Sequence, residues 1–194
     1  GLRAENYNLY YTGQNQQGDI VYEDENLLSE LDLFPSINLI YGLKEMSNLR
    51  FSLSRTIARP SFKEKSIAQI FDPVTSTTFI GNIDILPTKI LNYDLRWELF
   101  QEDAQMYAIS LFYKDFTNPI ELVVYNGASP NDYTPKNVDE AIVYGLELEL
   151  RKNLKFLSEN LSNFNLTFNT SIIRSEEIMD EKEYEGRIKS ARSG

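Results

Sequence analysis

The sequence contains no cysteine and no histidine among its 194 residues. Without cysteine the chain can form neither disulfides nor thiolate nucleophiles, and it cannot ligate zinc through sulfur. Without histidine it lacks the usual general base, the commonest metal ligand and every catalytic triad that depends on imidazole. These absences remove most familiar hydrolytic and metal-dependent chemistries, so we expect no cofactor and no metal site.

Long apolar runs are also missing. No stretch approaches the roughly 18 to 20 consecutive apolar residues that a membrane-spanning helix requires. Strands that alternate apolar and polar residues need no such run, so a membrane-spanning β-barrel stays possible. The formal net charge of −10 and the lack of a basic patch argue against nucleic acid as a partner.

Residues 91–99, with the sequence LNYDLRWEL, show most clearly what the chain has instead. Every odd position is large and apolar, and every even position is polar or charged. Only a β-strand sends alternate side chains to opposite faces, so this stretch predicts a strand with one apolar and one charged face. In a soluble sheet the apolar face would pack inward, whereas in a membrane barrel it would face lipid and the charged face would line a polar lumen.

Six further stretches predict strands of the same antiparallel meander. The seven ranges are 2–12, 35–42, 49–57, 91–100, 105–116, 142–150 and 164–172. The connections between them are alternately long and short. The ranges that we interpret as long loops are 13–33, 59–89, 118–139 and 175–190. The acidic run Glu23-Asp24-Glu25 is interpreted as part of a solvated loop rather than as a cation site.

The alternation of long and short connections places all long loops at one edge of the sheet, which is typical of outer-membrane barrels. The strands are about nine to eleven residues long, enough to cross a bilayer at a tilt. We therefore predict an all-β fold whose strands form part of a large transmembrane barrel. The residues expected to face lipid are Leu95, Trp97, Ile109, Leu111, Leu146 and Leu148. The residues expected to face the lumen are Asp94, Arg96, Glu98, Lys114, Glu147, Glu149 and Arg151.

Glu147 and Glu149 also resemble the carboxylate pairs of glycosidases. Charged residues recur on the polar face of several strands, however, and such repetition is typical of a lumen lining rather than of one catalytic centre. We therefore expect that the protein is not an enzyme.

A series of local phrases resembles the barrel of TonB-dependent outer-membrane receptors. In order along the chain they are GLRAE (1–5), LFPSINL (33–39), NLR (48–50), RTIARPSF (55–62), GN (81–82), LPT (86–88), NYDLRWE (92–98), FYK (112–114), NPI (118–120) and YGLELE (144–149). No phrase is specific by itself. Their order and spacing, over nearly the whole chain, carry the resemblance.

The resemblance implies a barrel of about 22 strands in the outer membrane of a Gram-negative bacterium, in contact with lipid and plugged by a separate amino-terminal domain. It also implies uptake of a scarce nutrient, either a metal chelate or an oligosaccharide, with energy delivered by the TonB complex through that plug. We expect this chain to be a fragment of the barrel without the plug. The alternative is a soluble β-rich module that binds a ligand or acts as an adhesin, with its apolar face buried between sheets.

The long loops would carry ligand recognition, because loops on the exposed rim of a rigid barrel are free to vary. The candidate ligand-binding residues are Arg59, Phe62, Phe71, Phe79, Asn82, Tyr125, Asn126 and Tyr133. For the phrase Arg59-Pro60-Ser61-Phe62 and the pair Gly81-Asn82 we favour a structural role at the base of the loop.

Overall fold

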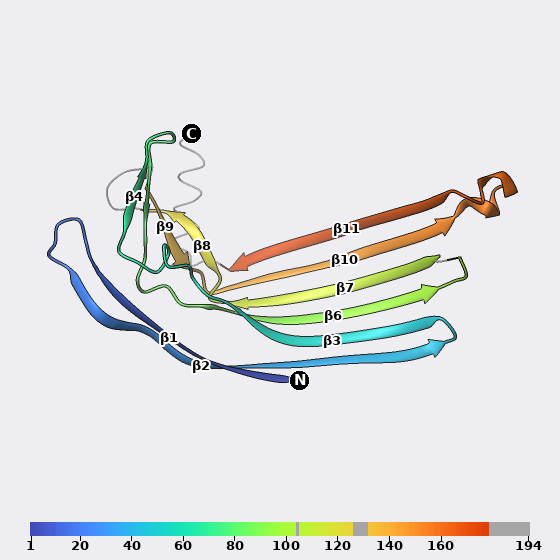
Figure 1. The fold of residues 1–194 in the computed structure, drawn as a ribbon, viewed down its shortest axis with the longest axis horizontal. Helices are drawn as coiled ribbons and strands as arrows, with labels where there is room; N and C mark the ends of the chain where they lie inside the picture. Colours follow the sequence, from blue (N-terminus) through green and yellow to red (C-terminus); the bar gives the residue numbers. More distant parts are fainter. Residues whose placement is uncertain (104, 126–131, 179–194) are drawn as a thin grey trace.

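The computed structural model describes residues 1–103, 105–125 and 132–178, and in this part the chain forms eleven strands and two short 3-10 turns. Seven strands form one antiparallel sheet in the order β1-β2-β3-β6-β7-β10-β11 (Figure 1). Their bounds are β1 Leu2–Gln14, β2 Val21–Lys44, β3 Ser47–Ala58, β6 Thr88–Phe100, β7 Met106–Thr117, β10 Glu140–Asn153 and β11 Asn165–Ile178. Each of the seven predicted ranges overlaps one of these strands. The predicted all-β antiparallel fold is confirmed.

The register of the sheet keeps the two faces distinct across all neighbouring strands. Leu95 of β6 lies opposite Phe51 of β3 and Leu111 of β7. One residue along, Arg96 lies opposite Arg50 and Ser110. Residues directly opposite each other in a sheet share a face, so the alternation within each strand becomes an apolar face and a polar face of the whole sheet.

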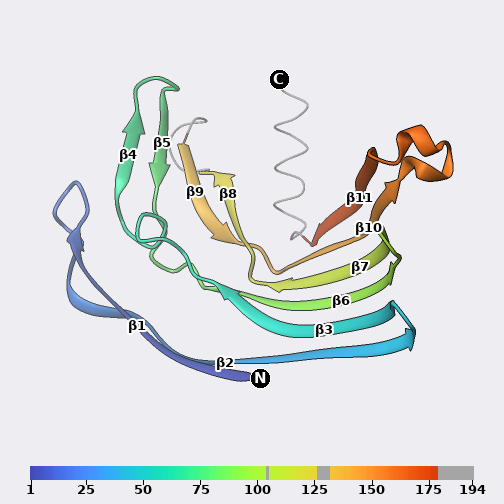
Figure 2. The ribbon, with the colours of Figure 1, turned by 45° about the vertical axis from the view of Figure 1, so that its right-hand side comes forward.

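The sheet is curved like a section of a barrel wall, as Figure 2 shows. On the apolar face, Leu95 and Leu111 are 40% and 49% exposed, whereas on the polar face Glu98 and Ala108 are only 4% and 3% exposed. Side chains on the concave side of a curved sheet crowd and shield one another, and those on the convex side splay apart. The polar face is therefore the concave side, and a broad apolar surface covers the convex side.

Strand β2 corrects the expectation of a long loop at residues 13–33. It begins at Val21, so the connection from β1 is only residues 15–20. Its first part, residues 21–35, pairs with β1, and its second part, from Ser36 onward, pairs with β3. The sequence pattern does not predict the first part as a strand, because its register with β1 shifts twice and its acidic residues interrupt the alternation of apolar and polar residues. The β1–β2 hairpin thus continues beyond the rest of the sheet (Figure 1).

The two loops at residues 59–87 and 118–139 are not structureless either. The first contains β4 (Gln69–Asp72) and β5 (Thr77–Ile80), and the second contains β8 (Ile120–Val124) and β9 (Asp132–Asn137). These strands form a separate four-stranded sheet in the order β4-β5-β9-β8, which we call the loop sheet. The strands escaped prediction because each has at most six residues and β9 contains a proline. At the end of the chain, residues 175–178 of the fourth expected loop belong to β11, and its remainder lies outside the described residues.

The opposite rim of the large sheet carries compact connections. β2 turns into β3 through residues 45–46, and β10 reaches β11 through the 3-10 turns η1 (Leu154–Phe156) and η2 (Glu159–Leu161). Within the described ranges, no helix has the length and apolar character needed to cross a membrane.

Candidate functional site

All seven residues predicted to face the lumen lie on the concave polar face of the large sheet. Asp94, Arg96 and Glu98 alternate along β6. On β7 and β10 the others follow by register: Lys114 opposite Asn92, Glu147 opposite Ser110, Glu149 opposite Ala108 and Arg151 opposite Met106. The six residues predicted to face lipid lie on the convex face, in the rows Leu95–Leu111–Leu146 and Trp97–Ile109–Leu148.

Five charged side chains form a continuous chain of ion pairs across this concave face, which we call the Arg–Glu chain. Arg50 Nε donates to Glu98 Oε1 at 2.5 Å, and Arg96 Nε donates to Glu98 Oε2 at 3.2 Å. Arg96 Nη2 then donates to Glu149 Oε2 at 3.0 Å, and Arg151 Nη2 donates to Glu149 Oε1 at 2.9 Å. Positive and negative groups alternate along the whole chain, so each carboxylate receives two guanidinium groups.

Small residues on β7 make this arrangement possible. Ser110 and Ala108 lie between β6 and β10 on the concave face, in the rows of Arg96 and Glu98. Arg96 Nη1 donates to Ser110 Oγ at 3.0 Å on its way across. A larger side chain at either position would occupy the space through which Arg96 reaches Glu149.

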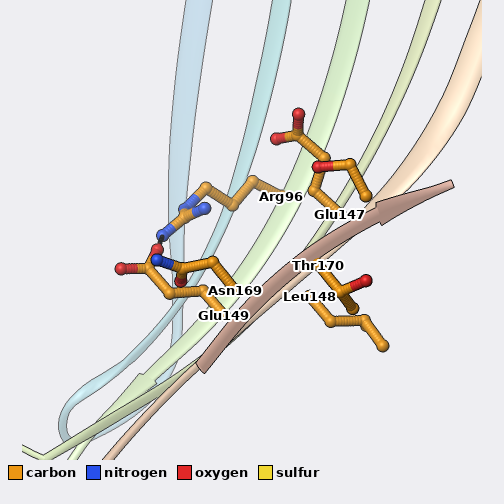
Figure 3. A pocket seen from close by; sticks show the side chains of 7 residues that line it. Arg96, Glu147, Leu148, Glu149, Asn169 and Thr170 are labelled. Carbon is orange, nitrogen blue, oxygen red and sulfur yellow. Dashed lines mark hydrogen bonds and ion pairs between the residues drawn. The ribbon is translucent and has the colours of Figure 1, made fainter. Parts of the chain in front are cut away.

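A shallow polar depression lies beside the Arg–Glu chain, between β10 and β11. It is lined by Arg96, Glu147, Leu148, Glu149, Asn169, Thr170 and Ser171. Figure 3 shows Arg96, Glu149 and Asn169 on one side of the strands and Leu148 and Thr170 on the other. Glu147 is exposed, and within the described part of the chain no side chain donates to it. The depression could hold a hydroxyl group, an amide or a cation, but in the described residues no group of acidic side chains is arranged to bind a metal ion.

Nearer the loops, an amide and an ammonium group complete the concave face. Lys114 Nζ donates to Asn92 Oδ1 at 3.0 Å, and Asn92 Nδ2 donates to Thr56 Oγ1 at 3.1 Å. Between these groups and the Arg–Glu chain lies Gly145, where a Cβ would meet the Phe112 ring at 2.7 Å and the Ile172 carbonyl oxygen at 2.6 Å. The glycine of the YGLELE phrase is therefore required by close packing.

The loop sheet is the second candidate site, and it lies on the rim that carries the long connections (Figure 2). One face of it carries a row of four apolar residues, one from each strand: Ile70, Phe79, Tyr133 and Val124, each directly opposite the next. Ile70 and Val124 are both 45% exposed, and the two aromatic rings between them are half-buried. Lys63 Nζ lies 4.0 Å from the centroid of the Phe79 ring, in a cation–π geometry.

The base of the loop sheet is held by side-chain amides and by a buried lysine. Asn82 Nδ2 donates to the Pro135 carbonyl at 3.0 Å, and Asn137 exchanges hydrogen bonds with both the N–H and the carbonyl of Leu86 at 2.7 and 2.9 Å. Lys65, only 3% exposed, donates to the carbonyls of Ile83 and Ile85 at 2.8 Å each. Burial lowers the pKa of Lys65, while Asp84 and Glu30 oppose that shift.

The predicted ligand-binding residues fall into three groups. Phe62 and Phe71 are highly exposed, at 78% and 61%. Phe79, Tyr125 and Tyr133 belong to the loop sheet or border it, and the backbone N–H of Tyr125 donates to the Asp132 carbonyl at 2.7 Å. Arg59 and Asn82 make contacts within the protein. Asn126 lies outside the described residues.

Arg59 is engaged at the junction between β3 and the β1–β2 hairpin. Its Nη2 atom lies 3.0 Å from Glu5 Oε2 and 3.6 Å from Asp32 Oδ2, and its guanidinium stacks 4.6 Å from the centroid of the Tyr7 ring. Next to it, Ser61 and Glu64 form a reciprocal pair: the Ser61 N–H donates to Glu64 Oε2 at 2.7 Å and the Glu64 N–H donates to Ser61 Oγ at 3.3 Å. These contacts favour a structural role for Arg59 and Ser61 at the base of the loop.

Sequence reasoning missed three polar residues that organise these regions: Arg50, Asn137 and Lys63. Arg50 alternates with Leu49 and Phe51 just as Arg96 alternates with Leu95 and Trp97, so the same signal marks it. Asn137 and Lys63 carry no such signal, since their partners Leu86 and Phe79 come from other strands or loops.

An antiparallel curved sheet with an exposed apolar convex face and an ion-paired concave face defines a section of membrane β-barrel wall. The sequence model of the family described as TonB dependent receptor-like, beta-barrel, matches residues 1–187. The chain belongs to this family. A search of curated protein sequences found no significant match.

Solved structures with the same fold are receptors of this kind. The siderophore receptor PirA from Pseudomonas aeruginosa superposes with a TM-score of 0.62 at 18% identity, over 76% of this chain and 29% of PirA. The ferric enterobactin receptor PfeA from the same organism, in complex with enterobactin, gives 0.51 at 23% identity, over 64% and 20%. The hemophore receptor HasR of Serratia marcescens, in complex with its hemophore HasA and heme, gives 0.54 at 13% identity, over 89% and 29%. The chain thus spans less than a third of each of these receptors.

Proposed function

We propose that this chain is part of the wall of an outer-membrane receptor that takes up a scarce nutrient with energy from the TonB complex. The observation that carries the proposal is the difference between the two faces of the large sheet. Apolar side chains cover the convex face and remain exposed, as lipid contact requires, while the Arg–Glu chain on the concave face pairs Glu98 and Glu149 with guanidinium groups, which suits a polar lumen. This arrangement favours a membrane barrel over the alternative, a soluble β-rich ligand-binding or adhesin module.

The partners follow from this role. Outer-membrane lipid would cover the convex face, and the TonB complex would act through a plug domain that lies outside these residues. A metal chelate is the first candidate ligand, because PirA, PfeA and HasR are named for siderophores, ferric enterobactin and a hemophore. An oligosaccharide is the second, because the half-buried rings of Phe79 and Tyr133 suit stacking on sugar rings as well.

The proposal is tested by expressing the full-length receptor in a Gram-negative host and fractionating the membranes. We expect the protein in the outer membrane, with a compact form in detergent that unfolds only on heating. Uptake of ferric chelates and of oligosaccharides would then be compared in cells with and without active TonB, and we expect uptake of one class to depend on TonB. Recovery of residues 1–194 as a cooperatively folding, monodisperse monomer without detergent would instead support the soluble module, since an open sheet with an apolar face should aggregate.

A further inference from the structure

The 59–87 and 118–139 loops are joined more closely to each other than loops of separate hairpins need to be. The first connects β3 to β6 and the second connects β7 to β10, so each could fold over its own hairpin. Instead, β5 of one loop pairs in parallel with β9 of the other, with Thr78 opposite Asp132 and Phe79 opposite Tyr133. A parallel pair cannot form within a tight hairpin, so this pairing exists only when both loops are in place.

Side chains strengthen the connection on one face of the loop sheet. The apolar row runs from Ile70 through Phe79 in one loop to Tyr133 and Val124 in the other. The middle step of that row, from Phe79 to Tyr133, therefore crosses from one loop to the other in the backbone register. Separating the loops would break the row between its two half-buried aromatic residues.

Asparagine side chains join the loops at their base. The side-chain amide of Asn137 pairs with Leu86 as the backbone of a neighbouring strand would. Its Oδ1 accepts from the Leu86 N–H at 2.7 Å, and its Nδ2 donates to the Leu86 carbonyl at 2.9 Å. The same Nδ2 donates to the Asn118 carbonyl at 2.9 Å, and Thr88 Oγ1 donates to that carbonyl at 3.0 Å. Asn82 adds its bond to the Pro135 carbonyl at 3.0 Å.

The neighbouring β1–β2 hairpin provides a contrast. In the described residues, the part of β2 before Ser36 has no backbone pairing with β3 and pairs only with β1. Charged side chains connect the two elements across this junction, with Arg59 between Glu5 and Asp32 and with Lys89 Nζ 3.9 Å from Glu30 Oε2. Asp32 is only 4% exposed, so these pairs are partly buried, but they join the two elements through a few side chains and without the backbone ladder of a shared sheet.

We infer that the described strands of these two loops, β4 and β5 of one and β8 and β9 of the other, form a single lid that opens and closes as one body, with Asn137 as its main positioning residue. The β1–β2 hairpin is not part of this lid. In the proposed receptor, a ligand would thus gain or lose access through both loops together. The inference rests on the proposed function only for this last step, since the coupling between the loops can be measured without any ligand.

The coupling is tested by amide hydrogen exchange on the full-length receptor in detergent, comparing Asn137→Asp with the wild type. The substitution keeps the shape of the side chain but places a carboxylate against the carbonyls of Leu86 and Asn118. We expect protection to fall by about tenfold or more, by the same factor in β4–β5 and in β8–β9, because loops that open as one body share one opening equilibrium. A loss confined to β8–β9, or no loss in either hairpin, would overturn the inference. Asn160→Asp, at an exposed position on the opposite rim, is the matched control and should change nothing.

A cross-link between the two loops distinguishes a lid that moves as one body from two loops that must move apart for uptake. Because this chain contains no cysteine, Thr78→Cys with Asp132→Cys introduces a defined pair, in the full receptor with any other cysteines replaced. We expect the disulfide to form readily and to leave TonB-dependent uptake unchanged. Thr78→Cys with Val123→Cys is the control, since β9 lies between these positions and holds them more than about 10 Å apart, too far for a disulfide. Uptake that stops on oxidation and returns on reduction would show that the loops must separate, and would contradict a single lid.

A receptor with equal exchange in both hairpins but no uptake of any chelate or oligosaccharide would refute the proposed function and leave the coupling intact.

Discussion

Arg96 Nη2 donates to Glu149 Oε2 at 3.0 Å, so one ion pair connects β6 to β10 across the intervening strand β7. Arg96 also binds Ser110 on β7 and shares Glu98 with Arg50 of β3. Four neighbouring strands are thus joined by side chains in addition to their backbone ladders. This arrangement suits a wall whose concave face carries charge, because the two less exposed carboxylates, Glu98 and Glu149, each have two guanidinium partners.

Arg96→Met should destabilise the barrel, because it leaves Glu98 and Glu149 each with one guanidinium partner in place of two. Glu98 is only 4% exposed, so the loss should exceed that of a surface pair. We expect the free energy of unfolding to fall by about 1 to 3 kcal/mol, below the range for fully buried pairs because water reaches the concave face. The measurement is urea unfolding of the full receptor in detergent.

The matched control for that variant is Lys155→Met, which removes the exposed pair between Lys155 and Glu159 on the short-turn rim. An exposed pair of this kind contributes about 0.3 to 0.5 kcal/mol. Equal effects of the two substitutions would mean that the Arg–Glu chain adds nothing beyond ordinary surface electrostatics.

Ala108→Leu should have an effect similar to that of Arg96→Met, although it changes no charge. Ala108 is 3% exposed and lies between Glu98 and Glu149, so a larger side chain would push the Arg–Glu chain apart. Overpacking of this kind costs about 1 to 3 kcal/mol. Ala4→Leu, at an exposed position of β1, should leave the unfolding midpoint unchanged. A neutral Ala108→Leu would contradict the steric account of why β7 carries small residues here.

The assignment of the two faces predicts opposite results for neighbouring positions on β10. Leu148→Lys places a charge on the convex face and should reduce assembly into the outer membrane, since a charge at mid-bilayer costs about 2 to 4 kcal/mol. Glu147→Lys reverses a charge on the concave face, where Glu147 is exposed, and should assemble normally. Quantification of the heat-modifiable form in outer-membrane fractions distinguishes the two. Equal assembly of both variants would mean that the faces are assigned wrongly.

The large sheet was predictable because each of its strands meets two different environments, and the sequence alternates accordingly. Leu95 and Arg96 show this directly, since their side chains point to opposite faces that differ in polarity. The upper part of β2 was not predictable by the same reasoning. There Glu23, Asp24 and Glu25 follow one another, and a hairpin that extends beyond the sheet has no face that must be uniformly apolar.

The loop sheet and the Arg–Glu chain show a different limit. The parallel pairing of Phe79 with Tyr133 joins residues from separate loops, and no local pattern indicates which strand pairs with which. The seven charged residues of the polar face could be assigned to it from alternation alone. Their pairing could not, because Arg96 reaches Glu149 only where Ala108 and Ser110 happen to be small.

Lys65 predicts an unusual dependence of the loop base on pH. Because burial lowers its pKa below the ordinary value of 10.5, the closed loop binds fewer protons than the open loop between the lowered pKa and 10.5. Stability therefore rises with pH across that window, and below it the full cost of burying the ammonium group is present. Cleavage of the 59–87 loop by subtilisin, normalised to a peptide substrate, should slow as the pH rises towards 10.5. In Lys65→Met the slope should disappear, and an identical slope in both proteins would assign the effect to another group.

Ligand recognition is best tested at Phe79 and Tyr133, the two aromatic residues that lie opposite each other on adjacent strands of the two loops. Deleting residues 126–135 would be ambiguous, because it removes most of β9 and with it the pairing to β5. Phe79→Leu and Tyr133→Leu keep an apolar side chain but remove the ring, so each should weaken binding by about 0.5 to 1.5 kcal/mol if a ligand stacks on the row. The double variant should lose less than the sum of the two, because adjacent rings share one contact surface. Phe62→Leu, at a position that is 78% exposed and outside the row, serves as the control. Titration with whichever chelate or oligosaccharide the uptake assay identifies gives the affinities, and a loss at Phe62 alone would move recognition away from the loop sheet.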